Sequence, residues 1–246
     1  MKIIPENPGY LVEKMTVYIA IDDTDMPDTP GTGKLAREIV EKIKERYNIE
    51  GITRHQFFVH PDIPYTSHNS GAVIHLSDVP ESDLSSLFEE IKHLVRARYA
   101  EGSDPGVCVA RHYQVTPSVM VYGRDAKQTV LTRNQAINLA KNAGILLEGL
   151  AGTEDGIIGA LAGVGLAASG CDGRYLQLGT IRNLSGQATV QEIKNAGIPL
   201  IQSVDGREIT EGMVHFRKFP QPIRMGGRPV LLVNEEEGRW VVQRRD

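Results

Sequence analysis

Three aspartates stand together directly after a short apolar run near the N-terminus. The run Thr16–Ile21 is followed by Asp22, Asp23 and Asp25, with Thr24 between the last two. Carboxylates held this close in a partly desolvated loop repel one another strongly. A divalent cation removes that repulsion, and Mg²⁺ is commonly held by one or two carboxylates together with phosphate oxygens. The pattern therefore predicts a Mg²⁺ site at the three aspartates, with an acidic turn bonded to its own amides as the structural alternative.

A glycine-containing segment follows a few residues later, directly before an apolar periodic stretch. It reads Gly31, Thr32, Gly33 and Lys34. Glycines let backbone amides approach a phosphate, and a helix N-terminus adds positive potential there. The segment is not a Walker P-loop, because Asp28 replaces the first glycine of that motif and Lys34 is not followed by Ser or Thr.

Three further segments have the composition of binding loops. The polar stretch His60–Ala72 could present His68, Asn69 and Ser70 to a substrate, or could simply be a long hairpin connection. Asp104 begins an Asp-Pro-Gly turn. The segment that contains Gly152, Thr153 and Gly156 opens a Gly/Ala-rich stretch, so it is either a second anion-binding helix start or a tight packing site.

Hydrophobic periodicity predicts the elements that position these segments. The expected strands are Thr16–Ile21, Thr53–Val59, Ala72–Leu76, Val107–Ala110 and Val119–Tyr122. Expected helices begin near Lys34, at Leu84, at Thr132 and at Gly156, and Thr132 with Gln135 forms a capping box. After about Gln187 the pattern changes to a short helix at Thr189 and four strand-like runs, Pro199–Val204, Met213–Phe219, Pro229–Val233 and Arg239–Gln243. The sequence thus predicts an α/β (α+β) fold, a mixed sheet with flanking helices, plus a small β-rich C-terminal subdomain over 187–246.

Bulk composition limits the function classes. The 246 residues are 41% hydrophobic and carry a net charge of −4, which argues against broad, sequence-blind nucleic-acid binding. No apolar stretch reaches the length of a membrane helix and none resembles a signal peptide. The two cysteines, Cys108 and Cys171, are far apart and could not form a zinc site unaided. We expect a cytoplasmic protein with no membrane partner.

Taken together, the segments resemble the catalytic domain of the tRNA(Ile) 2-agmatinylcytidine synthetases. That family has a GIDDTDS strand end, similar to Ala20–Met26 here, and an NPNIPWKTRGNGA loop, similar to His60–Ala72. Its NPG turn resembles Asp104–Gly106, and its glycine-rich GLIGALA helix start resembles Gly152–Ala162. The resemblance covers about Thr16–Leu178 and implies a kinase-like α/β catalytic domain over 1–186.

The resemblance also implies roles for the candidate residues. Asp22, Asp23 and Asp25 would hold Mg²⁺ on ATP, Gly31 to Gly33 would bind its phosphates, and Lys34 would neutralise charge on the transferred group. His68, Asn69, Ser70 and Asp104 would face the acceptor, while Gly152, Thr153 and Gly156 would complete the phosphate or substrate pocket. Phosphoryl or nucleotidyl transfer to an unidentified small-molecule or RNA acceptor follows, and a homodimer is left open.

Departures from the family keep other interpretations open. Gly33 and Lys34 stand where the family has threonines, and Thr66 and His68 replace its loop Lys and Arg. The OB-fold and Cys₄ zinc ribbon have no counterpart in a chain with two cysteines. The alternatives are a non-catalytic nucleotide- or metabolite-binding protein and a haloacid-dehalogenase-like phosphatase, although Pro27 stands where that phosphatase motif needs a hydroxyl. A third is an RNA-processing subunit with a basic tail (Arg217, Lys218, Arg224, Arg228, Arg239, Arg244 and Arg245).

Overall fold

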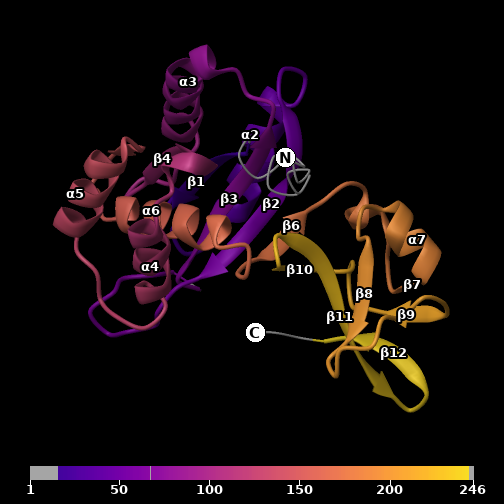
Figure 1. Cartoon of the computed structure of the whole chain (residues 1–246). Coiled ribbons are helices and arrows are strands. Elements are labelled where there is room, and N and C mark those ends of the chain that lie inside the picture. Colours follow the sequence, from indigo (N-terminus) through magenta and orange to yellow (C-terminus); the bar gives the residue numbers. More distant parts are fainter. Residues whose placement is uncertain (1–15, 67, 244–246) are drawn as a thin grey trace, which may run out of the picture.

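The computed structural model describes residues 16–66 and 68–243 and has the mixed architecture that the sequence predicts (Figure 1). Its strands are β1 (Val17–Asp22), β2 (Asn48–Gln56), β3 (Ser70–Ser77), β4 (Gly106–Arg111), β5 (Leu146–Gly149), β6 (Arg174–Gln177), β7 (Gln187–Thr189), β8 (Leu200–Ser203), β9 (Met213–His215), β10 (Ile223–Met225), β11 (Arg228–Glu236) and β12 (Arg239–Val242). Its α-helices are α2 (Thr32–Ile43), α3 (Leu84–Arg96), α4 (Pro117–Asp125), α5 (Arg133–Ala143), α6 (Gly156–Ala168) and α7 (Val190–Asn195). Within the described chain, no helix is long and apolar enough to cross a membrane.

The strand β1 is the centre of the N-terminal half because both of its faces are covered. Tyr18 and Ala20 pack into a core cluster with residues of α4, α5 and α6. Val17, Ile19 and Ile21 pack into a second cluster with residues of α2 and α3 on the opposite face. This alternation is the period-two pattern of a strand, applied to a strand that is buried on both sides.

The neighbours of β1 run antiparallel to it, and this direction decides which loops meet. The strand order is β5-β4-β1-β3-β2-β6-β10-β11-β12-β9-β7, with β8 beside β11. Ile21 pairs with Ala72 of β3, and Asp22 pairs with Gly106 of β4. Because each neighbour begins where β1 ends, the loops that precede β3 and β4 are brought to the aspartates.

One predicted strand is a helix, and this corrects the sequence interpretation. Val119–Tyr122 lies within α4, which begins with Pro117 in its first turn. A short apolar run has no periodicity that separates a strand from a buried helix. In the structure this segment is a helix packed closely against α6. A Cβ on Gly165 of α6 would lie 2.2 Å from the carbonyl oxygen of Val119. The strand expected at Thr53–Val59 is also displaced, because β2 ends at Gln56.

The capping signals in the sequence are confirmed. The side chain of Thr132 accepts a hydrogen bond from the backbone amide of Gln135 at the start of α5, and Gly144 ends that helix with φ 65°. Thr189 and Glu192 form the same box at the start of α7. These boxes satisfy backbone amides that have no partner within their own helix.

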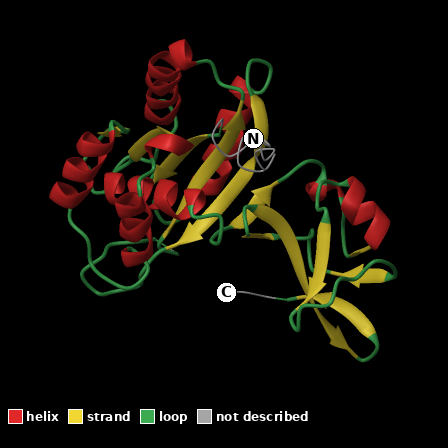
Figure 2. Ribbon diagram, in the orientation of Figure 1, coloured by secondary structure: helices red, strands yellow, loops and turns green. Residues whose placement is uncertain are grey.

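The C-terminal region is rich in strands, as predicted (Figure 2). It has its own core cluster. Strands β8 and β9 pair in parallel with β11 and β12 respectively. The sheet continues across the predicted boundary between 1–186 and 187–246, because Arg174 of β6 pairs with Ile223 of β10. The division into two domains stays a prediction.

Candidate functional site

A cavity of about 420 Å³ lies at the carboxyl end of β1. Its walls come from the aspartate turn, the loop before β3, the segment 126–134 and the start of α6. Five carboxylates line it, those of Asp22, Asp23, Asp25, Asp62 and Asp155. The volume is in the range typical of small-molecule sites.

The carboxylate of Asp22 lies in a slot between β3 and α6 that two glycines leave open. A Cβ added at Gly159 would lie 1.9 Å from Asp22 Oδ2, and one added at Gly71 would lie 3.2 Å from Oδ1. Burial raises the pKa of Asp22 well above its ordinary value, and the neighbouring charge of Asp23 raises it further. No cation of the described chain contributes to the pKa of this carboxyl. The slot is therefore shaped for a carboxylate whose charge the described residues leave uncompensated.

Asp23 occupies a strained position beside it. Its φ of 51° is in the left-handed region, which a residue with a side chain adopts only when its surroundings enforce it. Burial, and then the charge of Asp104, raise the pKa of Asp23 to about 6. A hydrogen bond from the backbone of Asp104 opposes this rise. Both adjacent carboxyls thus ionise less readily than an ordinary aspartate, and a nearby cation would favour their charged forms.

The carboxylate of Asp25 has a different role, because it is hydrogen-bonded on both oxygens. Oδ1 accepts from the backbone amide of Thr32 at 3.2 Å and from its hydroxyl at 2.8 Å. Oδ2 accepts from the hydroxyl of Thr66 at 3.1 Å. Asp25 therefore ties the start of α2 to the loop before β3, and it occupies a helix N-terminal amide that was expected to bind phosphate.

Asp104 is also held by the protein rather than directed into the cavity. Its Oδ1 accepts from the amide of Thr153 and its Oδ2 from the hydroxyl of Thr153, both at 2.8 Å. A Cβ on Gly152 would lie 1.7 Å from Asp104 Oδ1, and Gly152 has φ 60°. Asp104, Gly152 and Thr153 are outside the cavity lining, whereas Gly156 is part of it. Their predicted contacts with substrate or phosphate are untested, and the observed contacts fix the turn before α6.

The three predicted acceptor residues before β3 do line the cavity. His68, Asn69 and Ser70 all contribute to its wall. Asn69 donates its side-chain amide to the carbonyl of Phe58 at 2.7 Å, and Ser70 accepts from Arg54 Nε at 2.9 Å. These bonds stabilise the loop in the conformation that forms the wall.

The predicted phosphate segment is only partly in the cavity. Thr32 lines it, but Gly31, Gly33 and Lys34 do not. A Cβ on Gly33 would lie 2.7 Å from Leu176 Cδ1, so this glycine permits close packing of α2 on β6. Lys34 is exposed on α2. The catalytic role assigned to Lys34 has no support from its position.

Sequence reasoning missed the wall formed by residues 126–134. Arg133 at the start of α5 is the one lysine or arginine among the described lining residues. Its Nε lies 3.2 Å from Asp155 Oδ1, and it donates through Nη1 to the carbonyl of Thr153. The capping box at Thr132 was a signal for a helix start, but nothing local indicated that this start faces the aspartates.

The oxygen atoms that line the cavity suit Mg²⁺ that is bound together with a nucleotide. They do not suit a metal site in which every ligand comes from the protein. Oxygen ligands dominate the cavity, and the Asp22 and Asp23 carboxyls are uncompensated. Across residues 16–66 and 68–243, however, no group of three or more His, Cys, Asp or Glu side chains could hold a metal ion. The Mg²⁺ site at the three aspartates stays a prediction, and phosphate oxygens and water would have to complete the coordination there.

Comparison with known proteins identifies the fold. No protein-family model matches the chain, and no curated protein matches it. The apo crystal structure of TiaS, a tRNAIle2 agmatidine synthetase, is 22% identical with a TM-score of 0.52 over 61% of this chain and 35% of that chain. The complex of TiaS with its isoleucine tRNA and ATP gives 24% identity and a TM-score of 0.52 over 61% of this chain and 36% of that one.

A third solved structure, TiaS with the same tRNA, AMPCPP and agmatine, gives 21% identity and a TM-score of 0.51. This match again covers 61% of the present chain and 36% of the other. The chain therefore spans little more than a third of the length of these solved proteins. Over 61% of its residues, this protein has a fold similar to that of the tRNAIle2 agmatidine synthetases.

Proposed function

We propose that this protein binds ATP together with Mg²⁺ in the cavity at the end of β1 and transfers a phosphoryl or nucleotidyl group to an acceptor. The observation that supports this proposal most directly is the acidic end of the cavity. Asp22 and Asp23 have raised pKa values there, and no described cation lowers either of them. Such a concentration of uncompensated carboxyls is expected where a metal–phosphate ligand supplies the missing positive charge.

The cavity also has apolar side chains in its lining, which suit a nucleoside. Phe57, Tyr65, Leu131 and Ile158 contribute to this lining. A base could pack against these side chains while its phosphates lie at the carboxylates. Mg²⁺ would withdraw charge from the phosphate oxygens when bound. The protein's own part is to hold the triphosphate, with Asp22 fixed by its slot and Arg133 available to the phosphate oxygens.

The acceptor is either a small molecule or an RNA. The solved structures of similar fold are described as complexes with ATP and tRNA, and with AMPCPP, tRNA and agmatine. In the transfer, a bond forms between the acceptor's nucleophile and phosphorus as the bond from phosphorus to the leaving phosphate breaks. His68 and Asn69 at the end of the loop before β3, and Ser70 at the start of β3, line the cavity and are the residues we assign to the acceptor.

Isothermal titration of ATP tests the nucleotide site. Wild-type protein and Asp22→Asn are titrated with ATP in Mg²⁺ and in EDTA. The proposal expects binding that requires Mg²⁺ and is weakened about tenfold or more in the variant, since a charge-assisted contact contributes about 1.5–3 kcal/mol. Binding that is equal in Mg²⁺ and EDTA, or equal in both proteins, contradicts it.

This titration does not distinguish an enzyme from a non-catalytic nucleotide-binding protein. The two interpretations differ in turnover, so ATP consumption is followed with candidate amines and with unmodified tRNA as acceptors. Release of phosphate or pyrophosphate that depends on an acceptor and on Asp22 supports the enzyme. Tight Mg²⁺-dependent binding without turnover for any acceptor supports the binding protein.

A further inference from the structure

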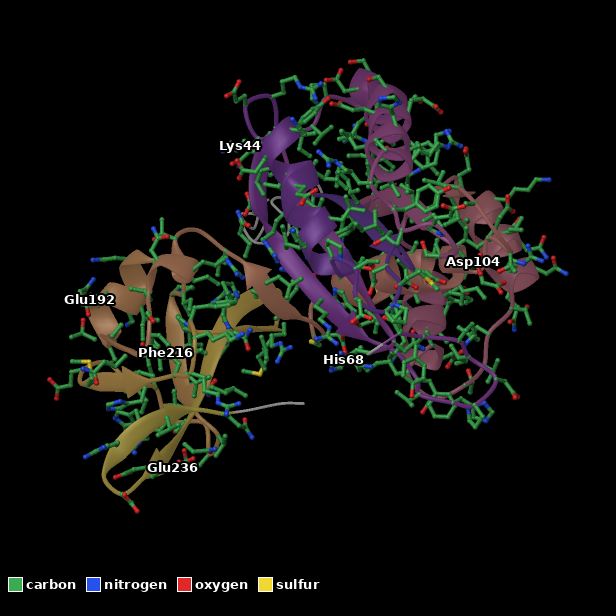
Figure 3. All side chains as sticks on the ribbon, turned by 180° about the vertical axis from the view of Figure 1, so that it is seen from behind. Lys44, His68, Asp104, Glu192, Phe216 and Glu236 are labelled. Carbon is green, nitrogen blue, oxygen red and sulfur yellow. The ribbon has the colours of Figure 1, made fainter. Side chains whose placement is uncertain are left out.

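A second cavity, of about 400 Å³, lies in the C-terminal region. It is formed by residues of β6, β10, β11 and β12, by His215 at the end of β9 and by the segment 216–219 that follows. Figure 3 places Phe216 of this cavity in the strand-rich part of the molecule, whereas His68 of the first cavity lies in the helix-covered part. The two cavities have no lining residue in common among those described.

The interior of this second cavity is apolar and partly aromatic. Ile223, Leu232 and Val241 contribute aliphatic surface. Phe219 also lines it, and the guanidinium of Arg182 lies 4.4 Å from the centroid of that ring. The stacked guanidinium fixes the ring and adds positive potential beside it. This surface suits a flat ring system better than a fully hydrated ion.

The rim is cationic. Arg174, Arg217 and Lys218 line the cavity together with His215, and its described lining contains no Asp or Glu. Arg217 and Lys218 are exposed, and neither takes part in an ion pair of the described residues. The first cavity has the opposite balance, with five carboxylates and one arginine. The whole chain has a net charge of −4, whereas every lysine, arginine, aspartate or glutamate in the described lining of this cavity is a lysine or an arginine.

One buried polar atom in the wall lacks a partner. Gln243 lines the cavity, and its Oε1 is buried with no hydrogen-bond partner in the described structure. An unsatisfied buried acceptor is costly, and native proteins have few of them. A rotation of the Gln243 side chain toward the cavity would let a ligand N–H satisfy this oxygen.

We propose that this C-terminal cavity binds a nucleotide, with its base against Phe219 and the aliphatic wall and its phosphate at Arg217 and Lys218. The nucleotide is either free or one residue of a single strand, since the recognising chemistry is the same. This proposal does not rest on ATP binding at the end of β1.

The test uses the full chain carrying Asp22→Asn, in EDTA, so that Mg²⁺-dependent binding in the first cavity does not contribute. AMP is titrated by calorimetry, and a short fluorescein-labelled oligoadenylate by anisotropy. The probing variants are Arg217→Gln with Lys218→Gln, and Leu232→Trp, which fills the cavity without altering charge. Arg228→Gln with Arg239→Gln is the matched control, because these exposed arginines are outside the lining. Circular dichroism verifies the fold of each variant.

AMP binding that falls about tenfold or more in both probing variants, but not in the control, assigns the site to a free nucleotide. Binding of the oligoadenylate alone, with the same pattern, assigns it to a nucleotide within a single strand. Absence of binding for both probes overturns the proposal. It is also overturned if the control weakens binding as much as the probing variants do, since general electrostatic attraction would then explain it. Loss of Mg²⁺-dependent ATP binding in the separate titration would refute only the function proposed for the first cavity.

Discussion

The carboxylate of Asp22 occupies the space that a side chain at Gly159 would fill. A Cβ on this glycine would lie 1.9 Å from Asp22 Oδ2, well inside van der Waals contact. Gly159 lies in the interior of α6, where glycine is normally unfavourable by about 0.5–1 kcal/mol relative to alanine. The helix thus contains a locally unfavourable residue at the point where the acidic end of the cavity needs room.

Gly159→Ala is therefore expected to damage the site despite its better helix propensity. We predict that the methyl group displaces Asp22, weakens Mg²⁺-dependent ATP binding about tenfold or more, and destabilises the fold by about 1–3 kcal/mol. Calorimetry and urea unfolding measure the two effects. Gly163→Ala is the matched control one turn later, where the added Cβ would meet the side chain of Val73 at 3.1 Å. Equal effects from the two substitutions would contradict the prediction.

Asp25 is predicted to act mainly on structure. Asp25→Ala removes the acceptor for the amide and hydroxyl of Thr32 and for the hydroxyl of Thr66, so we expect a loss of about 1–2 kcal/mol in unfolding free energy. Thr66→Ala removes only the bond to Oδ2 and should cost less than about 1 kcal/mol, roughly half of the larger effect. Urea unfolding of both variants provides the measurement. A fully stable Asp25→Ala protein would show that these hydrogen bonds contribute nothing.

The pairing of Asp104 with Thr153 gives a similar test of a predicted substrate residue. Asp104→Ala should destabilise the protein by about 1–2 kcal/mol, because the amide and hydroxyl of Thr153 lose a charged acceptor that water replaces at this exposed turn. Thr153→Val loses only the hydroxyl bond and should cost about 1 kcal/mol. If Asp104→Ala instead left stability intact and abolished turnover, the substrate-binding role expected from the sequence would be restored.

The sequence predicted elements whose signals lie within a few residues of each other. It did not predict elements whose conformation depends on contacts with distant parts of the chain. The helix over α5 was predictable because Thr132, Gln135 and Gly144 encode both of its ends within a few residues. The apolar run Val119–Tyr122 carried no such signal, and contact with α6 makes it helical. The short strands β5, β6, β7 and β10 were missed because each is defined by a partner strand rather than by its own pattern.

The same distinction applies within the site. Asp22, His68, Asn69 and Ser70 were predicted and do line the cavity, since antiparallel pairing brings the start of β3 to the end of β1. Gly33 was expected to contact phosphate because glycine permits it, but glycine also permits the approach of Leu176, and a sequence does not distinguish these uses.

A buried histidine pair predicts acid sensitivity. Thr53 Oγ1 lies within hydrogen-bond distance of His55 Nε2, at 2.8 Å, and of His75 Nε2, at 2.7 Å. Burial holds the pKa of His75 well below its ordinary value of 6.5, so the folded protein keeps it neutral. As the pH falls below about 6.5, the unfolded chain takes up a proton there that the folded chain does not. Stability from this residue is thus fully present above about pH 6.5 and is lost on acidification, by up to about 2 kcal/mol at pH 5.

Unfolding free energies measured by urea between about pH 7.5 and pH 5 test this linkage. His75→Gln retains a side-chain amide for Thr53 and should flatten the pH dependence. His93→Gln alters an exposed histidine of α3 and should keep the wild-type slope. A slope that is the same in all three proteins would show that His75 does not carry the effect.

The cation that serves the first cavity can be identified by comparing two substitutions. Arg133 lines the cavity and is oriented by Asp155 and by the carbonyl of Thr153, whereas Lys34 is exposed on α2 and outside the lining. If the nucleotide phosphates lie at the acidic end, Arg133→Gln should lower kcat/KM about tenfold or more through a lost charge-assisted contact, and Lys34→Gln should change it little. The reverse result would mean that α2 closes onto the phosphates during turnover, and it would return Lys34 to the catalytic role that the sequence suggested.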